Sequence, residues 1–150
     1  MKIVDLQVIP FRVSRRPYQY GKFLDETFVT QTLTKVITDE GAEGYYFGGS
    51  GHGDQDGMTT DQIHVLTGRL KDMIVGHDAF DREKFWHWMW VANIPENLLS
   101  VIDNVLWDLQ ARAFGMPIHK LLGGCREKVK AYGSTFPNLG MPEEYASHAL

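Results

Sequence analysis

The spacing of apolar residues changes once along the chain, near residue 58, and this change limits the folds that are possible. Before it, apolar and polar residues alternate in segments 4–8, 28–38 and 42–47, as they do in half-buried strands. After it, apolar residues recur at helical intervals as far as the Gly-Met-Pro sequence at 115–117. Strands followed by helices are typical of α+β folds. We therefore expect a three-stranded antiparallel meander followed by a helical bundle.

The alternation also predicts which residues share a face of each strand. Val4, Leu6 and Val8 alternate with polar residues in the first strand, and Pro10 places the far end of that strand at a sheet edge. In the second strand, three apolar residues lie on one face and three threonines on the other: Val29, Leu33 and Ile37, opposite Thr30, Thr32 and Thr34. The segment 14–27 between these strands has no sustained period, so we expect a loop there.

Capping and helix-breaking residues mark the helices. Thr59 and Gln62 match a capping box at the start of a helix, and Gly76 can end that helix. Further helices are expected downstream, over 81–92, 95–115 and the short segment 118–122. After the glycines at 123 and 124 the pattern begins again: residues 128–136 are predicted to form a strand, and Pro142 to begin a last helix.

Composition narrows the chemistry open to the chain. Its 150 residues carry a formal net charge of -4, which provides no basic surface for nucleic acid. No apolar run approaches the roughly 18 residues that a membrane span needs, so we expect no membrane association and a cytoplasmic location. The single cysteine, Cys125, cannot form an internal disulfide. No two of the six histidines have the i, i+4 spacing of a zinc site, so no metal ligand is expected among them.

The glycine-rich sequence "FGGSGHGDQDGMTTDQ", residues 47–62, fits none of the common ligand-binding loops. A phosphate-binding loop requires Lys and Ser or Thr after its last glycine, but Asp54 follows Gly53. Asp56 occupies the third glycine position of a dinucleotide-binding motif, and Ile63 the last ligand position of a calcium-binding loop. Two interpretations are left open: a solvated turn with His52 at the surface, or a loop that faces a substrate and offers His52 as a switchable donor.

Two further clusters favour structural interpretations. The sequence "FWHWMW", residues 85–90, has aromatic residues on two sides of its helix, which indicates core packing or a contact between subunits. Asp103 and Asp108 are five positions apart on the next helix, so their side chains diverge by about 140° and cannot share a metal ion. We expect salt bridges or capping interactions from these two carboxylates.

The segment "SVIDNVLWDLQARAFGMPIHKLLGG", residues 100–124, carries a family likeness. An Asp-x-x-x-x-Asp helix, then Gly-x-Pro, Leu-Leu-Gly-Gly and a strand like "VKAYGS" resemble the mandelate racemase/muconate lactonizing enzyme-like branch of the enolase superfamily. The order of the predicted elements agrees over the whole chain. This resemblance implies an α+β capping domain over residues 1–126. It also implies that residues 127–150 begin a TIM-like (β/α) barrel with its first strand and helix.

The resemblance implies a reaction as well as a fold. Members remove the proton α to a carboxylate with the help of Mg²⁺, using a base and acidic metal ligands from later barrel strands, beyond Leu150. No catalytic or metal-binding residue is therefore assigned to this chain. The favoured activity is dehydration of an acid sugar. Racemisation, epimerisation or cycloisomerisation of a hydroxy acid is an alternative, and so is a non-catalytic capping or binding module if the chain is complete.

Five substrate-binding residues follow from the resemblance. Two lid loops, which match residues 14–27 and 47–58, would close over the barrel mouth and select a small carboxylate substrate. The proposed contacts are two residues in the first lid, two in the second and a hydroxyl after the first barrel strand: Tyr20 and Lys22, Phe47 and His52, and Ser134. A polar lid of this kind suits a hydroxylated acid. We also expect the protein to be a homo-oligomer.

Overall fold

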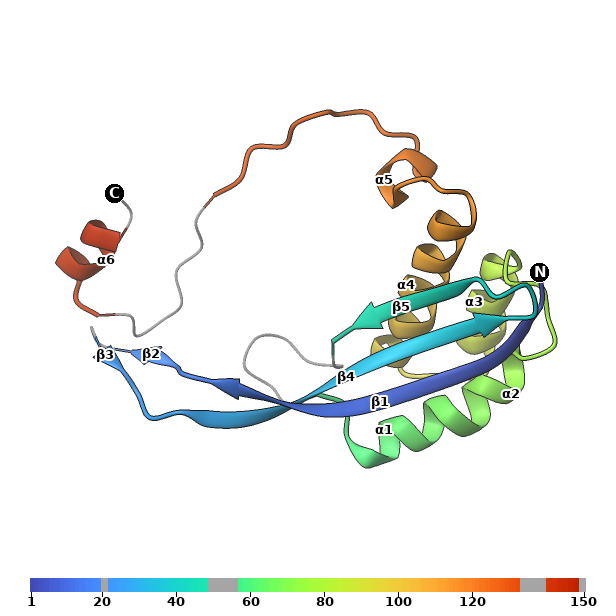
Figure 1. Cartoon of the computed structure of the whole chain (residues 1–150), viewed down its shortest axis with the longest axis horizontal. Helices are drawn as coiled ribbons and strands as arrows, with labels where there is room; N and C mark the ends of the chain where they lie inside the picture. Colours follow the sequence, from blue (N-terminus) through green and yellow to red (C-terminus); the bar gives the residue numbers. More distant parts are fainter. Residues whose placement is uncertain (20–21, 49–56, 133–139, 149–150) are drawn as a thin grey trace. The chain divides into compact units, whose positions relative to one another are not determined.

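The computed structural model describes residues 1–19, 22–48, 57–132 and 140–148 (Figure 1). The chain forms two compact units, Met1–Phe11 with Thr30–Gly124, and Arg12–Val29 with Cys125–Leu150. The described strands are β1 (Ile3–Arg15), β2 (Tyr18–Gln19), β3 (Lys22–Phe23), β4 (Thr27–Thr38) and β5 (Glu43–Phe47). The described helices are α1 (Thr60–Val65), the π-helical η1 (Leu66–Leu70), α2 (Lys71–Ile74), α3 (Arg82–Val91), α4 (Glu96–Ala113), α5 (Ile118–Leu121) and α6 (Pro142–His148).

The predicted meander is confirmed, in the order β1-β4-β5. The alternation predicted for β1 is wrong at one residue: Leu6 is buried and Val8 packs partly against the core, but Val4 is 48% exposed. Ile3 is fully buried instead. Main-chain hydrogen bonds at the end of α2 hold Ile3 in this orientation, because its N–H donates to His77 O and its carbonyl accepts from Gly76 N. Strict alternation is therefore interrupted between Ile3 and Leu6.

Strand β4 has the two faces that the sequence predicts, and the threonine-bearing face is the buried one. Thr32, Thr34 and Val36 are inaccessible to solvent, whereas the apolar residues of the other face are half-buried. The Thr32 hydroxyl donates to Gly48 O at 2.8 Å, so its burial leaves no unpaired donor. The Thr34 hydroxyl has no hydrogen-bond partner among the described residues. Alternation alone does not say which face of a strand the helices will cover.

The prediction of a loop over residues 14–27 is wrong. Strand β1 continues to Arg15, β4 begins at Thr27, and the short strands β2 and β3 pair antiparallel between them, with Gln19 opposite Lys22. The Thr27 hydroxyl donates to Arg15 O at 3.4 Å, and the Arg12 guanidinium lies 4.9 Å from the centre of the Phe28 ring. No residue of this hairpin whose burial is described is buried, on either face. Apolar and polar residues alternate where one face of a strand is buried, so no such alternation is expected here.

The helices begin and end close to the predicted positions. The capping box is confirmed, since Thr59 Oγ1 accepts from Gln62 N at 3.3 Å and Gln62 Oε1 accepts from Thr59 N at 2.9 Å. The first helix contains one π-helical turn, η1, and the chain leaves it at Gly76 with a φ of 86°. No helix among the described residues is both long enough and apolar enough to cross a membrane.

The core of the larger unit lies between the sheet and the helices that cover its threonine face. Helix α4 contributes most to this core, and the fully buried side chains of the other elements include Ile3, Leu6, Leu66, Leu70 and Phe85. Strand β5 lies so close to α4 that a Cβ atom on Gly44 would be 2.3 Å from Val105 O and 2.5 Å from Leu109 Cβ. A glycine is therefore required where this strand meets the longest helix.

The C-terminal part of the second unit is only partly as predicted. Helix α6 begins at Pro142 and has two glutamates in its first turn, as expected. Residues 128–132 form no strand, and Tyr132 is 88% exposed. Residues 133–136 of the predicted strand lie outside the described residues. A parallel barrel strand requires neighbours, and no described strand pairs with residues 128–132. The predicted domain boundary at residue 126 stays a prediction.

Candidate functional site

The structure describes two of the five predicted substrate-binding residues. Lys22 is exposed in β3, where it pairs with Gln19 across the hairpin. Phe47 ends β5 and is 62% exposed, with its ring centre 5.4 Å from that of Phe11. Tyr20, His52 and Ser134 lie outside the described residues. A cation and a large exposed aromatic ring are thus available to a ligand, each within its own compact unit.

The residues that flank segment 49–56 are held on one strand. Gly48 N donates to Thr32 O at 3.0 Å, and the Thr32 hydroxyl donates back to Gly48 O. On the other side, Gly57 N donates to Thr30 O, and a Cβ atom on Gly57 would lie 2.9 Å from that oxygen. The residues on either side of segment 49–56, within the predicted second lid, are therefore fixed to β4 at Thr32 and Thr30. Phe47 directly precedes the first of them, Gly48.

The exposed face of β4 and β5 carries a charged cluster that the sequence analysis missed. Lys35 Nζ lies 2.6 Å from Glu43 Oε1, and the Tyr45 hydroxyl also donates to the Glu43 carboxylate. The hydrogen bond from Lys35 lowers the pKa of Glu43 and raises the pKa of Lys35. The same carboxylate raises the pKa of Tyr45, because the phenol donates a hydrogen bond to it. All three groups are thus held in their ordinary protonation states near neutral pH.

Asp108 connects this cluster to helix α4. Its Oδ2 atom accepts from Tyr45 N at 2.8 Å and from Arg112 Nε at 2.7 Å. The hydrogen bond to Asp108 raises the pKa of Arg112, whose guanidinium lies 5.0 Å from the Tyr45 ring centre. Asp103 forms a separate ion pair, 2.7 Å from Arg82 Nη1. The expectation that these two carboxylates make salt bridges is confirmed. Asp108 holds the edge strand β5 against the helix.

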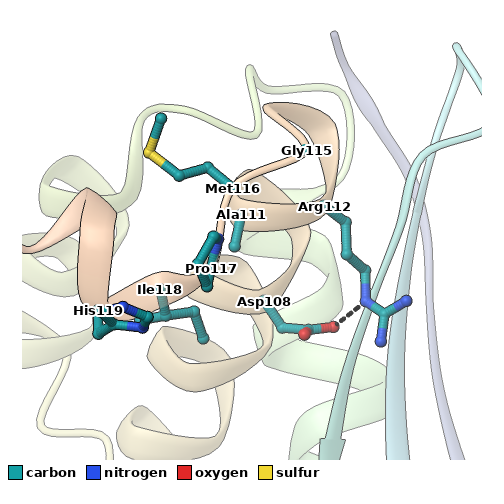
Figure 2. Close-up of a pocket in the computed structure, with 8 residues that line it drawn as sticks. All are labelled: Asp108, Ala111, Arg112, Gly115, Met116, Pro117, Ile118 and His119. Atoms are coloured by element: carbon teal, nitrogen blue, oxygen red, sulfur yellow. Dashed lines mark hydrogen bonds and ion pairs between the residues drawn. The ribbon is translucent and has the colours of Figure 1, made fainter. Parts of the chain in front are cut away.

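A hollow of about 500 Å³ lies where α4 turns into α5 (Figure 2). Gly115, with a φ of 61°, ends the helix, and Pro117 directs the chain into α5. The hollow is bounded by the Asp108–Arg112 ion pair and by small or apolar groups with one histidine: Ala111, Gly115, Met116, Pro117, Ile118 and His119. Its charged groups already pair with each other, so it offers a surface for binding or packing and no catalytic arrangement.

The described residues do not fit a magnesium site. Magnesium prefers carboxylate oxygens in near-octahedral arrangement. Within residues 1–19, 22–48, 57–132 and 140–148, no three His, Cys, Asp or Glu side chains are close enough to hold a metal ion. The carboxylates of the candidate site, Glu43 and Asp108, are each committed to cationic partners. The described residues can therefore bind and orient a ligand and exclude water from it.

Comparison with known proteins gives consistent results. The family model of the mandelate racemase/muconate lactonizing enzyme N-terminal domain matches residues 4–123. The chain is 31% identical over 111 residues to a D-galactonate dehydratase family member from Paenibacillus sp. (strain JDR-2), covering 69% of this chain and 26% of the relative. It is 30% identical over 116 residues to D-mannonate dehydratase from Rhizorhabdus wittichii, covering 73% and 27%. The chain thus spans about a quarter of the length of these curated relatives.

Solved structures agree with the family match. D-glucarate dehydratase from Agrobacterium tumefaciens, complexed with magnesium, is similar with a TM-score of 0.69 and 34% identity, over 89% of this chain and 35% of that one. A member of the enolase superfamily from Polaromonas sp. JS666 has a TM-score of 0.75 over 99% of this chain and 40% of its own. At 23% identity, this second likeness supports the fold alone.

Proposed function

The chain belongs to the mandelate racemase/muconate lactonizing enzyme N-terminal domain family of the enolase superfamily, and from that premise we propose that it is the substrate-selecting cap of an acid-sugar dehydratase. The observation that carries this proposal is the similarity to a D-mannonate dehydratase, a D-glucarate dehydratase and a member of the D-galactonate dehydratase family, each at 30% identity or more. The alternatives are racemisation, epimerisation and cycloisomerisation. Among the proteins compared above, those with 30% identity or more are named for dehydratases and not for any of these activities.

The proposed reaction divides between this chain and the rest of the enzyme. The proton α to the carboxylate is removed, the hydroxyl on the neighbouring carbon leaves, and the resulting enol tautomerises to a 2-keto-3-deoxy acid; overall, one water molecule is lost. We assign the base and the ligands of a Mg²⁺ ion to barrel residues outside this chain. The magnesium in the solved D-glucarate dehydratase supports that assignment of the cofactor. A cytoplasmic location stays part of the proposal.

The contribution of this chain is to bind and orient a hydroxylated carboxylate. Lys22 offers an exposed ammonium group to the carboxylate, and the exposed ring of Phe47 offers an apolar surface to the carbon chain. Because Phe47 directly precedes the Thr32–Gly48 hydrogen bonds, its position is set by the strand. We assign Tyr20, His52 and Ser134 to contacts with substrate hydroxyl and carboxylate oxygens. Substrate recognition at such a site depends on placed polar groups.

The test of this function is a panel of C6 acid sugars, assayed with Mg²⁺ on the intact protein. Detection of a 2-keto-3-deoxy product from one or more of them is expected. Mandelate and muconate serve as controls for racemase and cycloisomerase activity. A folded, magnesium-supplied protein that dehydrates none of the sugars contradicts the proposal, and conversion of a control acid instead would favour the corresponding alternative.

A second experiment addresses the lid residues. His52→Ala should raise KM or lower kcat without lowering Tm, because the proposed role of His52 is in substrate contact. Phe47→Ala should do the same. Phe114→Ala is a matched control, since Phe114 is 60% exposed and its ring lies 5.2 Å from Phe80, much as Phe47 lies beside Phe11. Unchanged kinetics in the His52 variant would favour the other interpretation, in which His52 lies at the surface of a solvated turn.

A further inference from the structure

The outer face of the sheet, opposite the helices, carries an aromatic pair that stays partly exposed. Phe47 is 62% exposed at the end of β5, and its ring centre lies 5.4 Å from that of Phe11, which is half-buried in β1. Strand β4 runs between β1 and β5 (Figure 1), so the two rings meet across the central strand. Leu33 is directly opposite Phe47 on β4 and therefore lies on the same face. The pair is thus built into the sheet, and one of its members is the proposed substrate contact.

The main chain of Phe47 is fixed, so its side-chain torsions are its remaining freedom. Phe47 pairs with Leu33 in the antiparallel register of β4 and β5. The next residue, Gly48, is bound to Thr32 twice, since its N–H donates to Thr32 O at 3.0 Å and its carbonyl accepts from the buried Thr32 hydroxyl at 2.8 Å. A phenylalanine side chain can rotate about χ1 among three staggered positions. The neighbours of the ring therefore decide which position it occupies.

Phe11 is placed to make that choice. The ring centres of Phe11 and Phe47 are 5.4 Å apart and the ring planes are tilted by 43°, within the range that aromatic pairs prefer. A contact of this kind favours the orientation in which the rings meet by roughly two- to tenfold. Differences of about tenfold are what small changes in an apolar pocket contribute to substrate discrimination. The preference that Phe11 provides is therefore large enough to affect selection.

We propose that Phe11 is a positioning residue, which sets the orientation of the Phe47 ring and through it the choice among acid sugars; this inference rests on the proposed function. An aromatic ring packs against the side of a sugar chain that bears C–H groups, and the configuration of each carbon decides which side that is. A ring held in one orientation presents one surface to both epimers, and so distinguishes them better than a ring that adapts to each. Phe11 itself is assigned no contact with substrate.

The pair also lies where the chain continues into both segments that the proposed function uses. Phe11 is the last residue before the compact unit that begins at Arg12, and this unit contains Lys22. Phe47 is the last residue of β5, and segment 49–56 begins just after it. A substitution at Phe11 can therefore change substrate selection although the residue is outside both predicted lids.

A double-mutant cycle on the intact protein tests the inference, with the ratio of kcat/KM for two epimeric acid sugars as the readout. Phe11→Leu should change this ratio by about two- to tenfold, in the same direction as Phe47→Ala. In a protein that already carries Phe47→Ala, Phe11→Leu should change the ratio by less than about 1.5-fold, because the ring that it positions is gone. Phe11→Tyr keeps the ring and should keep the ratio. A loss of stability lowers both kcat/KM values by the same factor, so the ratio separates positioning from a purely structural role.

A second aromatic pair of nearly the same geometry provides the matched control. The ring centres of Phe80 and Phe114 are 5.2 Å apart and their planes are tilted by 44°. Phe80→Ala removes one ring of that pair and should leave the ratio as it is in the wild type. A ratio that Phe11→Leu leaves unchanged, or changes equally with and without the Phe47 ring, overturns the positioning role.

Fluorine NMR separates failure of this inference from failure of the proposed function. With para-fluorophenylalanine at position 47, Phe11→Leu should shift the fluorine resonance and increase the mobility of the ring, whereas Phe80→Ala should change neither. This result does not depend on turnover. If no sugar is dehydrated while the ring becomes more mobile in Phe11→Leu, the dehydratase proposal fails and Phe11 still fixes Phe47. An unchanged resonance in Phe11→Leu overturns the positioning role whatever the activity.

Discussion

Replacing Gly44 by alanine should lower the free energy of unfolding by about 2–4 kcal/mol. The new methyl group would lie 2.3 Å from Val105 O and 2.5 Å from Leu109 Cβ, so β5 and α4 must separate by roughly 1 Å to restore van der Waals contact. Separation strains the closest contact between sheet and helix. It also lengthens the hydrogen bond from Tyr45 N to Asp108 Oδ2, now 2.8 Å, and bonds to charged groups are worth about 1.5–3 kcal/mol.

Thermal and urea unfolding measure this effect. For a chain of this size, the loss corresponds to a decrease in Tm of roughly 5–15 °C. Gly68→Ala is the matched control, because nothing lies within 4 Å of a Cβ atom at Gly68 and the residue is within a helical segment. Alanine there should raise stability by about 0.4–1 kcal/mol. If Gly44→Ala leaves Tm unchanged while Gly68→Ala behaves as expected, the close approach of β5 and α4 is wrong.

Four other substitutions test local features of the fold. Thr32→Val should lower the free energy of unfolding by about 1 kcal/mol, because it removes the hydrogen bond to Gly48 O. Thr34→Val, an isosteric change two residues away, should be neutral or raise it by about 1 kcal/mol, because the Thr34 hydroxyl has no hydrogen-bond partner among the described residues. Equal losses for the two variants in urea unfolding would contradict this contrast. Thr59→Ala should cost about 1 kcal/mol through loss of the capping box, measured in the same way. The hydrogen bond from Lys71 lowers the pKa of Asp5 below 3.8, so the stability from this ion pair is present above that pH and is lost as pH falls through the native pKa. Asp5→Asn should therefore flatten the acid side of the stability profile as pH falls below the ordinary pKa of an aspartate, and an unchanged slope would contradict it.

Features that depend on neighbours in sequence could be predicted well. The capping box at Thr59, the helix that follows Pro95 and the stop at Gly115 are local, and the structure contains all three. The order of strands followed by helices also gave the correct fold class. Asp108 and Arg112 are four residues apart on one helix, a spacing that signals an ion pair.

Features that depend on partners distant in sequence could not be predicted. The hydrogen bond from Tyr45 to Asp108 joins residues 63 positions apart, and nothing near either residue indicates it. The pattern of β4 showed two faces, but burial of the threonine face depends on helices that come later in the chain. The hairpin of β2 and β3 was missed because its described side chains show no buried face, so its backbone pairing left no periodic pattern in the sequence.

We propose that this chain selects the substrate, and the ratio of kcat/KM for two acid sugars that differ at one stereocentre tests this role most directly. Phe47→Ala should change this ratio at least about fivefold with Tm unchanged, because the exposed ring is the proposed substrate contact and contributes little to the core. The Phe114→Ala control should leave the ratio as it is. A ratio that stays within about twofold of the wild type for Phe47→Ala would contradict the claim.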